Sequence, residues 1–235
     1  MKRFWDRATA ERHPDGWRVT LDGKPVRVPS GAALSLPSRG LAEAVTTEWQ
    51  AAGGGPGGTL SYADLPLTRI AGTGQERIAP NPEPVILELA RYGESDLLCY
   101  RASHPQELVQ RQAEHWQPWL NWADRSLGAR LRVTTGVVYV PQSARALAAL
   151  AAAVAAFDPF ALAALGVAVP ALGSLVLALA LAGRRLDAAE AHRLATLDET
   201  FQEEYWGAED EAVARRRRIG EDVAVAARVL ELLRA

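Results

Sequence analysis

Large and polar side chains alternate in short runs near the N-terminus, a pattern typical of β-strands. Residues 17–21 alternate in this way, Asp22-Gly23 supplies a turn that is favoured in hairpins, and the alternation resumes over residues 25–29. A third short run covers residues 33–36. These patterns predict a small β-rich unit at the start of the chain.

A helix is predicted directly after these strands. Ser38 is a suitable N-cap because a serine hydroxyl can accept a hydrogen bond from a backbone N–H of the first turn. Apolar residues then recur at helical spacing, at Leu41, Ala42, Val45 and Trp49. Residues 53–58 are all glycine apart from Pro56, which predicts a flexible break after the helix.

Beyond this break the apolar residues follow a helical period. Residues 81–84 are typical of a helix start, because proline is tolerated in a first turn. Further helices are predicted over residues 105–127 (bent or divided at Pro118), 143–157, 159–165, 170–181, 187–205 and 208–233, and residues 131–134 and 137–140 have the pattern of extended segments. We therefore expect an α+β fold, with a mixed α/β domain over residues 1–80 and a larger all-helical domain over residues 81–235.

One apolar stretch is long enough to raise the question of a membrane span. No charged residue occurs from Ala161 to Ala182, a length that would just cross a bilayer. Gly166, Pro170 and Gly173 interrupt it, so two short buried helices are the favoured interpretation. A membrane-associated assembly factor that inserts residues 161–182 stays open as an alternative.

Composition and charge exclude several classes of function. The 235 residues carry a net charge of −2, which gives no overall attraction to nucleic acid or anionic lipid. Cys99 is the only cysteine, so neither an intramolecular disulfide nor a cysteine-based zinc site can form. The N-terminal residues lack the apolar core of a secretory signal and contain an early acid, unlike a transit peptide. These features favour the bacterial cytoplasm, with the mitochondrial matrix as the compartment if the source is eukaryotic.

No catalytic, cofactor or metal site can be identified in the sequence. The glycine-rich residues 53–58 lack the Gly-Lys-Ser/Thr ending of a phosphate-binding loop and follow a helix, not a strand. The four histidines (His13, His104, His115 and His192) are scattered without metal-ligand spacing. A hydrolase-like enzyme, with a site assembled from Asp/Glu and His residues of separate segments, stays open as a second alternative.

Three tryptophans recur at every third position of one predicted helix. Trp116 shares a face with Leu120 and should be in the core, whereas Trp122 lies about 120° away around the axis and should be half exposed or packed on the other domain. Two interpretations of the set, which also includes Trp119, stay open. The tryptophans are ordinary packing residues, or Trp122 is an aromatic contact for a partner protein.

Acidic and basic residues separate near the C-terminus. Between Arg193 and Arg215 there is no basic residue, and Arg215 begins a run of four arginines. The acids in this interval are Asp198, Glu199, Glu203, Glu204, Glu209, Asp210 and Glu211. The arginines can pair back to the acids on a solvated face, or the acids can form a docking face for a basic partner surface.

Several segments in a characteristic order and spacing carry a resemblance to a known family. They are Arg3-Phe4-Trp5, residues 21–26, residues 41–45 with Glu48-Trp49, residues 65–69, residues 94–101, Arg111-Gln112, Leu172-Gly173-Ser174, and residues 197–199 with Gln202, Trp206 and Gly207. In these segments the chain resembles the assembly chaperone of the F-type ATP synthase catalytic sector that acts on the alpha subunit, a family of mitochondria and some bacteria.

The resemblance implies a function as well as a fold of a mixed α/β unit followed by a helical domain. It implies that the protein binds the unassembled alpha subunit, shields its interface until the beta subunit replaces it, and does not hydrolyse nucleotide. Reversible capping is physically reasonable because large obligate interfaces are apolar and aggregate when exposed. We expect a non-enzymatic monomer with no cofactor, no nucleic-acid partner and no stable membrane insertion.

The resemblance also singles out candidate contacts for the partner. Glu199 matches a family segment regarded as important for function and is the first choice, followed by Glu203 and Trp206. Trp122 and Arg69 complete the predicted set, and Trp49, which also matches the family, is expected to be structural because it lies on a core stripe.

Overall fold

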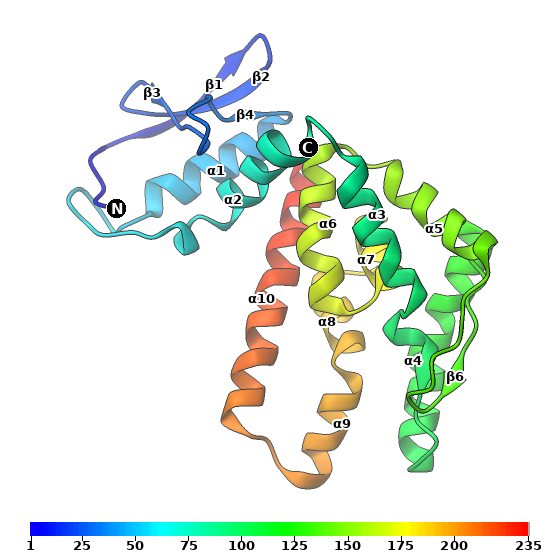
Figure 1. Ribbon diagram of the computed structural model, residues 1–235. Helices are drawn as coiled ribbons and strands as arrows, with labels where there is room; N and C mark the ends of the chain where they lie inside the picture. The colour runs from blue at the N-terminus through cyan, green and yellow to red at the C-terminus, as the bar shows by residue number, and fades with distance from the viewer. Residues whose placement is uncertain (235) are drawn as a thin grey trace. The chain divides into compact units, whose positions relative to one another are not determined.

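The computed structural model describes residues 1–234, which form two compact units (Figure 1). The N-terminal unit contains Met1–Pro82, Asp158–Ala164 and the chain from Arg228, and the helical unit contains Glu83–Phe157 and Leu165–Ala227. Two helices, α6 (Pro159–Leu172) and α10 (Asp210–Leu232), contribute residues to both units. The α+β fold class is confirmed. The domain division between residues 80 and 81 stays a prediction.

An antiparallel sheet opens the N-terminal unit. Its strands are β1 (Ala8–His13), β2 (Gly16–Leu21), β3 (Lys24–Pro25) and β4 (Ser35–Leu36). Strand β2 pairs with the other three, and its register with β1 runs from Ala8 opposite Leu21 to His13 opposite Gly16. The hairpin at Asp22-Gly23 is confirmed. Strand β1 was not predicted, because polar and charged side chains interrupt any alternation along it.

The helix predicted after the sheet is α1 (Arg39–Ala51), and its capping and buried face are both confirmed. Ser38 accepts a hydrogen bond from the backbone N–H of Leu41 at 3.1 Å. The four apolar positions of the predicted stripe are the buried residues of the helix. The unit continues through η1 (Tyr62–Asp64), α2 (Pro66–Thr73) and η2 (Gly74–Ile78).

Two adjacent residues of α1 hold the first turn of α2. Glu48 accepts hydrogen bonds from the backbone N–H groups of Leu67 (2.6 Å) and Thr68 (3.0 Å), donors that a helix start leaves unpaired. The indole Nε1 of Trp49 donates to Thr68 Oγ1 at 2.9 Å. Trp49 is 6% exposed and packs edge-on against Trp5, so the structural role predicted for it is confirmed.

The helical unit is built from helices with one short strand pair. Its elements are α3 (Glu83–Arg91), η3 (Tyr92–Glu94), η4 (Leu97–Cys99), β5 (Tyr100–Arg101), α4 (Gln106–Trp122), η5 (Ala123–Leu127), β6 (Thr134–Thr135), α5 (Ala144–Ala155), α7 (Leu175–Ala182), α8 (Ala188–Ala195) and α9 (Leu197–Trp206). Strands β5 and β6 pair in parallel. Helix α4 continues past Pro118, and Trp116 is fully buried as predicted, with its Nε1 donating to the backbone oxygen of Leu194 at 2.9 Å.

The long apolar stretch divides into α6 and α7, but not where the sequence predicted. Helix α6 continues through Pro170, and the break falls at Gly173, whose φ of +60° is a left-handed conformation that suits glycine. Ser174 then caps α7, and all eight residues of that helix are buried. Among residues 1–234 no helix combines the length and apolarity that a bilayer span requires.

Two other sequence predictions differ from the structure. Residues 137–140 form no strand, because they pair with no neighbouring segment and are largely exposed. The helix predicted over residues 187–205 is two helices, since the backbone of Thr196 leaves the helical conformation (φ −106°, ψ 16°) and its hydroxyl closes α8 by donating to the His192 carbonyl.

Candidate partner-binding surface

Helix α9 carries most of the residues that the sequence singled out, and its inner face anchors it in the helical unit. Leu197 and Phe201, one turn apart, are its buried residues. The guanidinium of Arg111, on α4, lies 5.1 Å from the centre of the Phe201 ring. The acidic and aromatic residues between and beyond these two positions are left to meet neighbouring helices or solvent.

Two glutamates of α9 pair with arginines of α10. Glu199 Oε1 lies 2.7 Å from Arg215 Nη2, and Glu203 Oε1 lies 2.5 Å from Arg216 Nη1. The second pair is the better protected, with side chains only 17% and 18% exposed, and the adjacent Glu203 carboxylate raises the pKa of Arg216. Arg215 and Arg216 therefore pair with acids of α9, as the first of the two sequence interpretations expects.

A second set of polar contacts joins α9 to α4. Arg111 bridges two carboxylates, with Nη1 2.7 Å from Glu204 Oε2 and Nη2 2.8 Å from Glu107 Oε1. Tyr205 donates its hydroxyl to the other oxygen of Glu107. This hydrogen bond lowers the pKa of Glu107 and raises the pKa of Tyr205.

The C-terminal end of α9 is free. Trp206 is 77% exposed, and Gly207 turns the chain away with a φ of +87°. The exposed carboxylates that follow, those of Glu209, Asp210 and Glu211, have no hydrogen-bond or ion-pair partner within residues 1–234. A large aromatic side chain therefore stands in solvent beside three uncompensated negative charges. We call Glu199, Glu203, Tyr205 and Trp206 the α9 surface.

The other predicted contacts lie outside this surface. Trp122, at the end of α4, is half-buried against Trp119, with ring centres 6.4 Å apart and its Nε1 buried without a partner. Arg69, on α2 in the N-terminal unit, is exposed. The structure brings Glu199, Glu203 and Trp206 together and leaves Trp122 and Arg69 on other elements.

A buried polar network joins the start of α9 to α4 and β5. Gln112 donates from Nε2 to Asp198 Oδ1 (2.7 Å) and accepts from the backbone N–H of Ala102 (2.7 Å). Arg101 donates to the Gln112 carbonyl at 2.6 Å and lies over the Trp116 ring. Burial raises the pKa of Asp198 and lowers the pKa of Arg101. The network fixes the start of α9 relative to α4.

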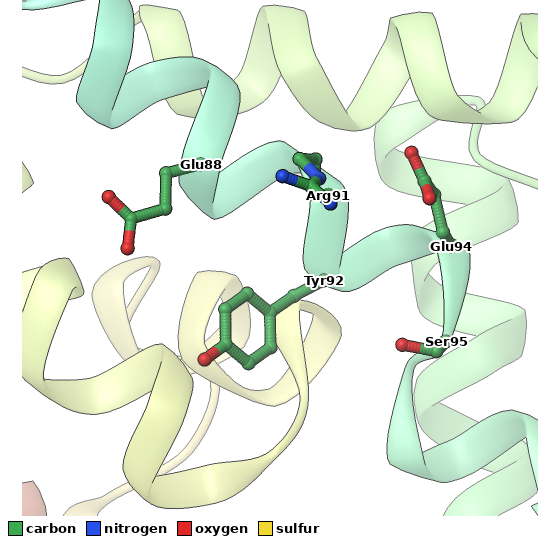
Figure 2. Close-up of a pocket in the computed structure, with 5 residues that line it drawn as sticks. All are labelled: Glu88, Arg91, Tyr92, Glu94 and Ser95. Carbon is green, nitrogen blue, oxygen red and sulfur yellow. The ribbon is translucent and has the colours of Figure 1, made fainter.

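A pocket of about 280 Å³ lies at the end of α3, lined by Glu88, Arg91, Tyr92, Glu94 and Ser95. Figure 2 shows that these side chains point in different directions and do not converge on one point. No hydrogen bond or ion pair joins any two of these side chains. The pocket therefore shows none of the convergent polar groups that a catalytic site requires.

The histidines do not gather into a site. His13 faces Asp15 at 3.6 Å, His104 bonds to the Ser103 hydroxyl, and His192 bonds to the carbonyl of Arg216. Within residues 1–234 no three His, Cys, Asp or Glu side chains are grouped so that they could hold a metal ion.

The sequence model of a known family, described as ATP12 chaperone protein, matches residues 2–124. This match spans more than half of the chain. The chain belongs to the ATP12 chaperone family. The resemblance drawn from the sequence is thereby confirmed, and with it the general function of an ATP synthase assembly chaperone.

Solved structures of this family agree over the whole chain. The crystal structure of Atp12 from Paracoccus denitrificans is 41% identical with a TM-score of 0.92, covering 99% of this chain and 98% of that one. A mutant of the same Atp12p gives 40% identity and a TM-score of 0.92, covering 99% and 97%. A protein from Agrobacterium tumefaciens gives 39% identity and a TM-score of 0.91, covering 99% and 86%.

The segments that carried the ATP12 resemblance contact one another in the structure. Asp96, fully buried, accepts hydrogen bonds from Ser174 Oγ (2.8 Å), from the backbone N–H of Val176 (3.0 Å) and from that of Leu98 (3.1 Å). One carboxylate thus serves the first turns of both α7 and η4. The sequence offered no spacing rule for this network or for the one around Gln112, because Asp96 and Ser174 lie 78 residues apart and Gln112 and Asp198 lie 86 apart.

Proposed function

We propose that this protein binds the unassembled alpha subunit of the F-type ATP synthase, shields its apolar interface, and is replaced there by the beta subunit. Membership of the ATP12 chaperone family supports the general function. The observation that carries the choice of surface is Trp206, which is 77% exposed at the free end of α9.

An exposed tryptophan is well suited to capture another protein. Tryptophan is enriched among interface residues that dominate binding energy, and its burial removes a large apolar area from water. The unpaired carboxylates of Glu209, Asp210 and Glu211 surround this end with negative charge. Such a rim favours a partner surface that is apolar at its centre and basic at its edge.

The paired glutamates contribute by holding the aromatic end in place. Glu199 and Glu203 fasten α9 to α10 through Arg215 and Arg216. Replacing Glu199 by lysine puts two positive charges opposite each other at a site that is about half exposed, where a single pair contributes roughly 1 kcal/mol or less. Glu199→Lys is therefore expected to misplace Trp206 and weaken alpha-subunit binding while the protein stays folded.

Trp122 and Arg69 are proposed as secondary contacts. Trp122 is half-buried at the end of α4, and the exposed part of its ring offers an aromatic surface to a bound protein. No carboxylate among residues 1–234 pairs with the guanidinium of Arg69 on α2. A basic group in the N-terminal unit suits an acidic patch on the same client.

A chaperone of this kind needs no bond-making chemistry of its own. It lowers the concentration of free, aggregation-prone alpha subunit by mass action, and the native partner displaces it when that partner buries more apolar surface.

Aggregation of purified alpha subunit, followed by light scattering, tests the proposal. An excess of the chaperone is expected to suppress scattering, and Trp206→Ser to lose most of this effect. Tyr62→Ser is the matched control, because Tyr62 is 62% exposed but lies on η1 of the N-terminal unit. Unchanged scattering with the wild-type protein in excess would overturn the proposal. Equal loss in both variants would overturn the choice of surface.

A further inference from the structure

The loop after β6 exposes an apolar segment that the proposed function does not use. Val137, Val138 and Tyr139 are 96%, 71% and 59% exposed, which is unusual for three consecutive large apolar residues. The residues from 137 to 140 make no backbone hydrogen bond to the rest of the described chain. Both the side chains and the backbone groups of this segment are therefore available to another molecule.

The loop is held in place at both ends. Gln142, 9% exposed, donates to the Arg132 carbonyl (3.0 Å) and accepts from the Arg132 N–H (2.7 Å), as a neighbouring strand would. On the other side Gly136 donates to the Arg101 carbonyl at 2.8 Å, which extends the β5–β6 pairing. A segment with fixed ends loses less conformational entropy on binding than a free loop does.

An open pocket of about 900 Å³ adjoins this segment and is rich in arginine. Arg130, Arg132 and Arg145 line it together with Val133 and Val140, and Asp124 is the only acid among the lining residues. No carboxylate within residues 1–234 pairs with any of the three guanidinium groups. The pocket thus has an uncompensated positive charge beside an apolar edge.

We propose that residues 137–140 and the arginine pocket form a docking surface for an extended segment of the client polypeptide that carries carboxylates next to apolar side chains. An extended chain can pair its backbone with residues 137–140 as an added strand. Its apolar side chains cover Val137 and Val138, and its carboxylates reach the arginines. The client is the unassembled alpha subunit. This inference rests on the proposed function only for the identity of that client.

This surface is separate from the α9 surface within the same unit. Helix α4 meets α9 through Arg111, and η5, which continues α4, lines the pocket with Asp124. The thirteen residue steps from Arg111 to Asp124 correspond to roughly 20 Å of helix. Opposite charges also separate the two surfaces, since the pocket is basic and the end of α9 is acidic. The two can bind different segments of one client.

A designed peptide tests the docking surface without any subunit of the synthase. The probe is a fluorescent twelve-residue peptide that alternates valine and threonine and carries two aspartates, and its counterpart carries two lysines instead. Fluorescence anisotropy is expected to show that the full-length protein binds the aspartate peptide at least about tenfold more tightly than the lysine peptide. Val138→Asp and Arg145→Glu, tested separately, are each expected to weaken the aspartate peptide about tenfold.

Matched control variants separate this surface from general stickiness. Leu87→Ser removes an apolar side chain that is 54% exposed on α3, and Arg185→Glu reverses an exposed guanidinium outside the pocket. Both controls should bind like the wild type. Equal affinity for the two peptides, or no effect of either pocket variant, would overturn the docking surface.

Comparing the wild-type protein in the peptide assay and in the alpha-subunit scattering assay keeps the two proposals distinct. If the wild type suppresses scattering but binds neither peptide, the docking surface is wrong and the proposed function stands. If the wild type binds the aspartate peptide but does not affect the alpha subunit, the docking surface stands and the proposed client is wrong.

Discussion

The buried carboxyl of Asp96 makes a prediction about stability that follows directly from its surroundings. Burial raises the pKa of Asp96 from 3.8 to about 6, although three hydrogen bonds to the carboxylate lower it. The neutral form is therefore favoured by the fold more than by the unfolded chain. The perturbation is Asp96→Asn, which keeps the shape and removes the titration.

The sign and size of the effect follow from linkage. Below pH 3.8 the carboxyl is neutral in both states and the fold bears no penalty. As the pH rises from 3.8 towards about 6, Asp96 loses its proton in the unfolded chain before it does so in the fold. The free energy of unfolding therefore falls over this range and stays at the lower value above it. The corresponding free energy is roughly 3 kcal/mol. The asparagine variant has no such dependence.

The assay is urea unfolding of the wild type and the variant between pH 4 and pH 7. Part of this free energy is already lost at pH 4, so we expect the wild-type free energy of unfolding minus that of Asp96→Asn to fall by roughly 2.5 kcal/mol across this range. An amide cannot accept all the hydrogen bonds that the carboxylate accepts from Ser174 and Val176, and this loss changes the free-energy difference by the same amount at every pH. Only the change of the difference with pH measures the titration of Asp96.

Asp22 provides a control of opposite sign. Its exposed carboxylate accepts hydrogen bonds from the backbone N–H groups of Arg7 and Asp6, and these lower the pKa of Asp22. The difference between the wild type and Asp22→Asn should therefore rise with pH at and below about pH 4, so this control extends the assay to lower pH, and it should stay nearly level from pH 4 to pH 7. If the difference for Asp96→Asn is flat from pH 4 to pH 7, the hydrogen bonds to the carboxylate fully offset burial and the pKa of Asp96 is not raised.

Three further predictions concern single sites. Burial raises the pKa of the Cys99 thiol to about 12, so the thiol should react with a disulfide reagent only at the rate of unfolding, and rapid reaction of native protein would contradict this. Gly58→Ala places a Cβ 1.7 Å from the Gly53 carbonyl oxygen, so thermal unfolding should show a loss above about 2 kcal/mol; an unchanged Tm would count against the turn. Glu203→Gln leaves the shielded Arg216 guanidinium without its charge partner, so we expect a loss of about 1–2 kcal/mol in urea unfolding, and none if solvent replaces the partner.

The sequence was most informative where the determinants are local. The Ser38 cap, the Asp22-Gly23 hairpin and the buried stripe of α1 each depend on residues a few positions apart, and the structure has all three. Periodicity also placed Trp116 in the core. Such features are readable because each follows from one hydrogen bond or one helix face.

The sequence was least informative where distant residues decide the structure. Asp96, far away in the chain, accepts hydrogen bonds from Ser174 Oγ and the Val176 N–H and so supports the break at Gly173, whereas the sequence placed the break at Pro170. Residues 137–140 have the composition of a strand but no neighbouring segment to pair with. Strand formation depends on a partner strand, which the local pattern does not reveal.

The candidate site shows the same division. The acids of α9 and the arginines of α10 were visible as a charge separation, but their pairing, Glu199 with Arg215 and Glu203 with Arg216, depends on how the two helices pack. The exposure of Trp206 likewise depends on where α9 ends. The roles of these residues, and of Trp122 and Arg69, in binding a partner stay predictions.

The central claim is that the chaperone occupies the alpha-subunit surface that the beta subunit later covers. Gel filtration of a purified complex of alpha subunit and chaperone, before and after the addition of beta subunit, tests it most directly. We expect a single early peak that contains both proteins, and release of the free chaperone as alpha and beta subunits form their own complex. A stable complex of all three proteins, or no early peak with the chaperone in excess, would contradict it.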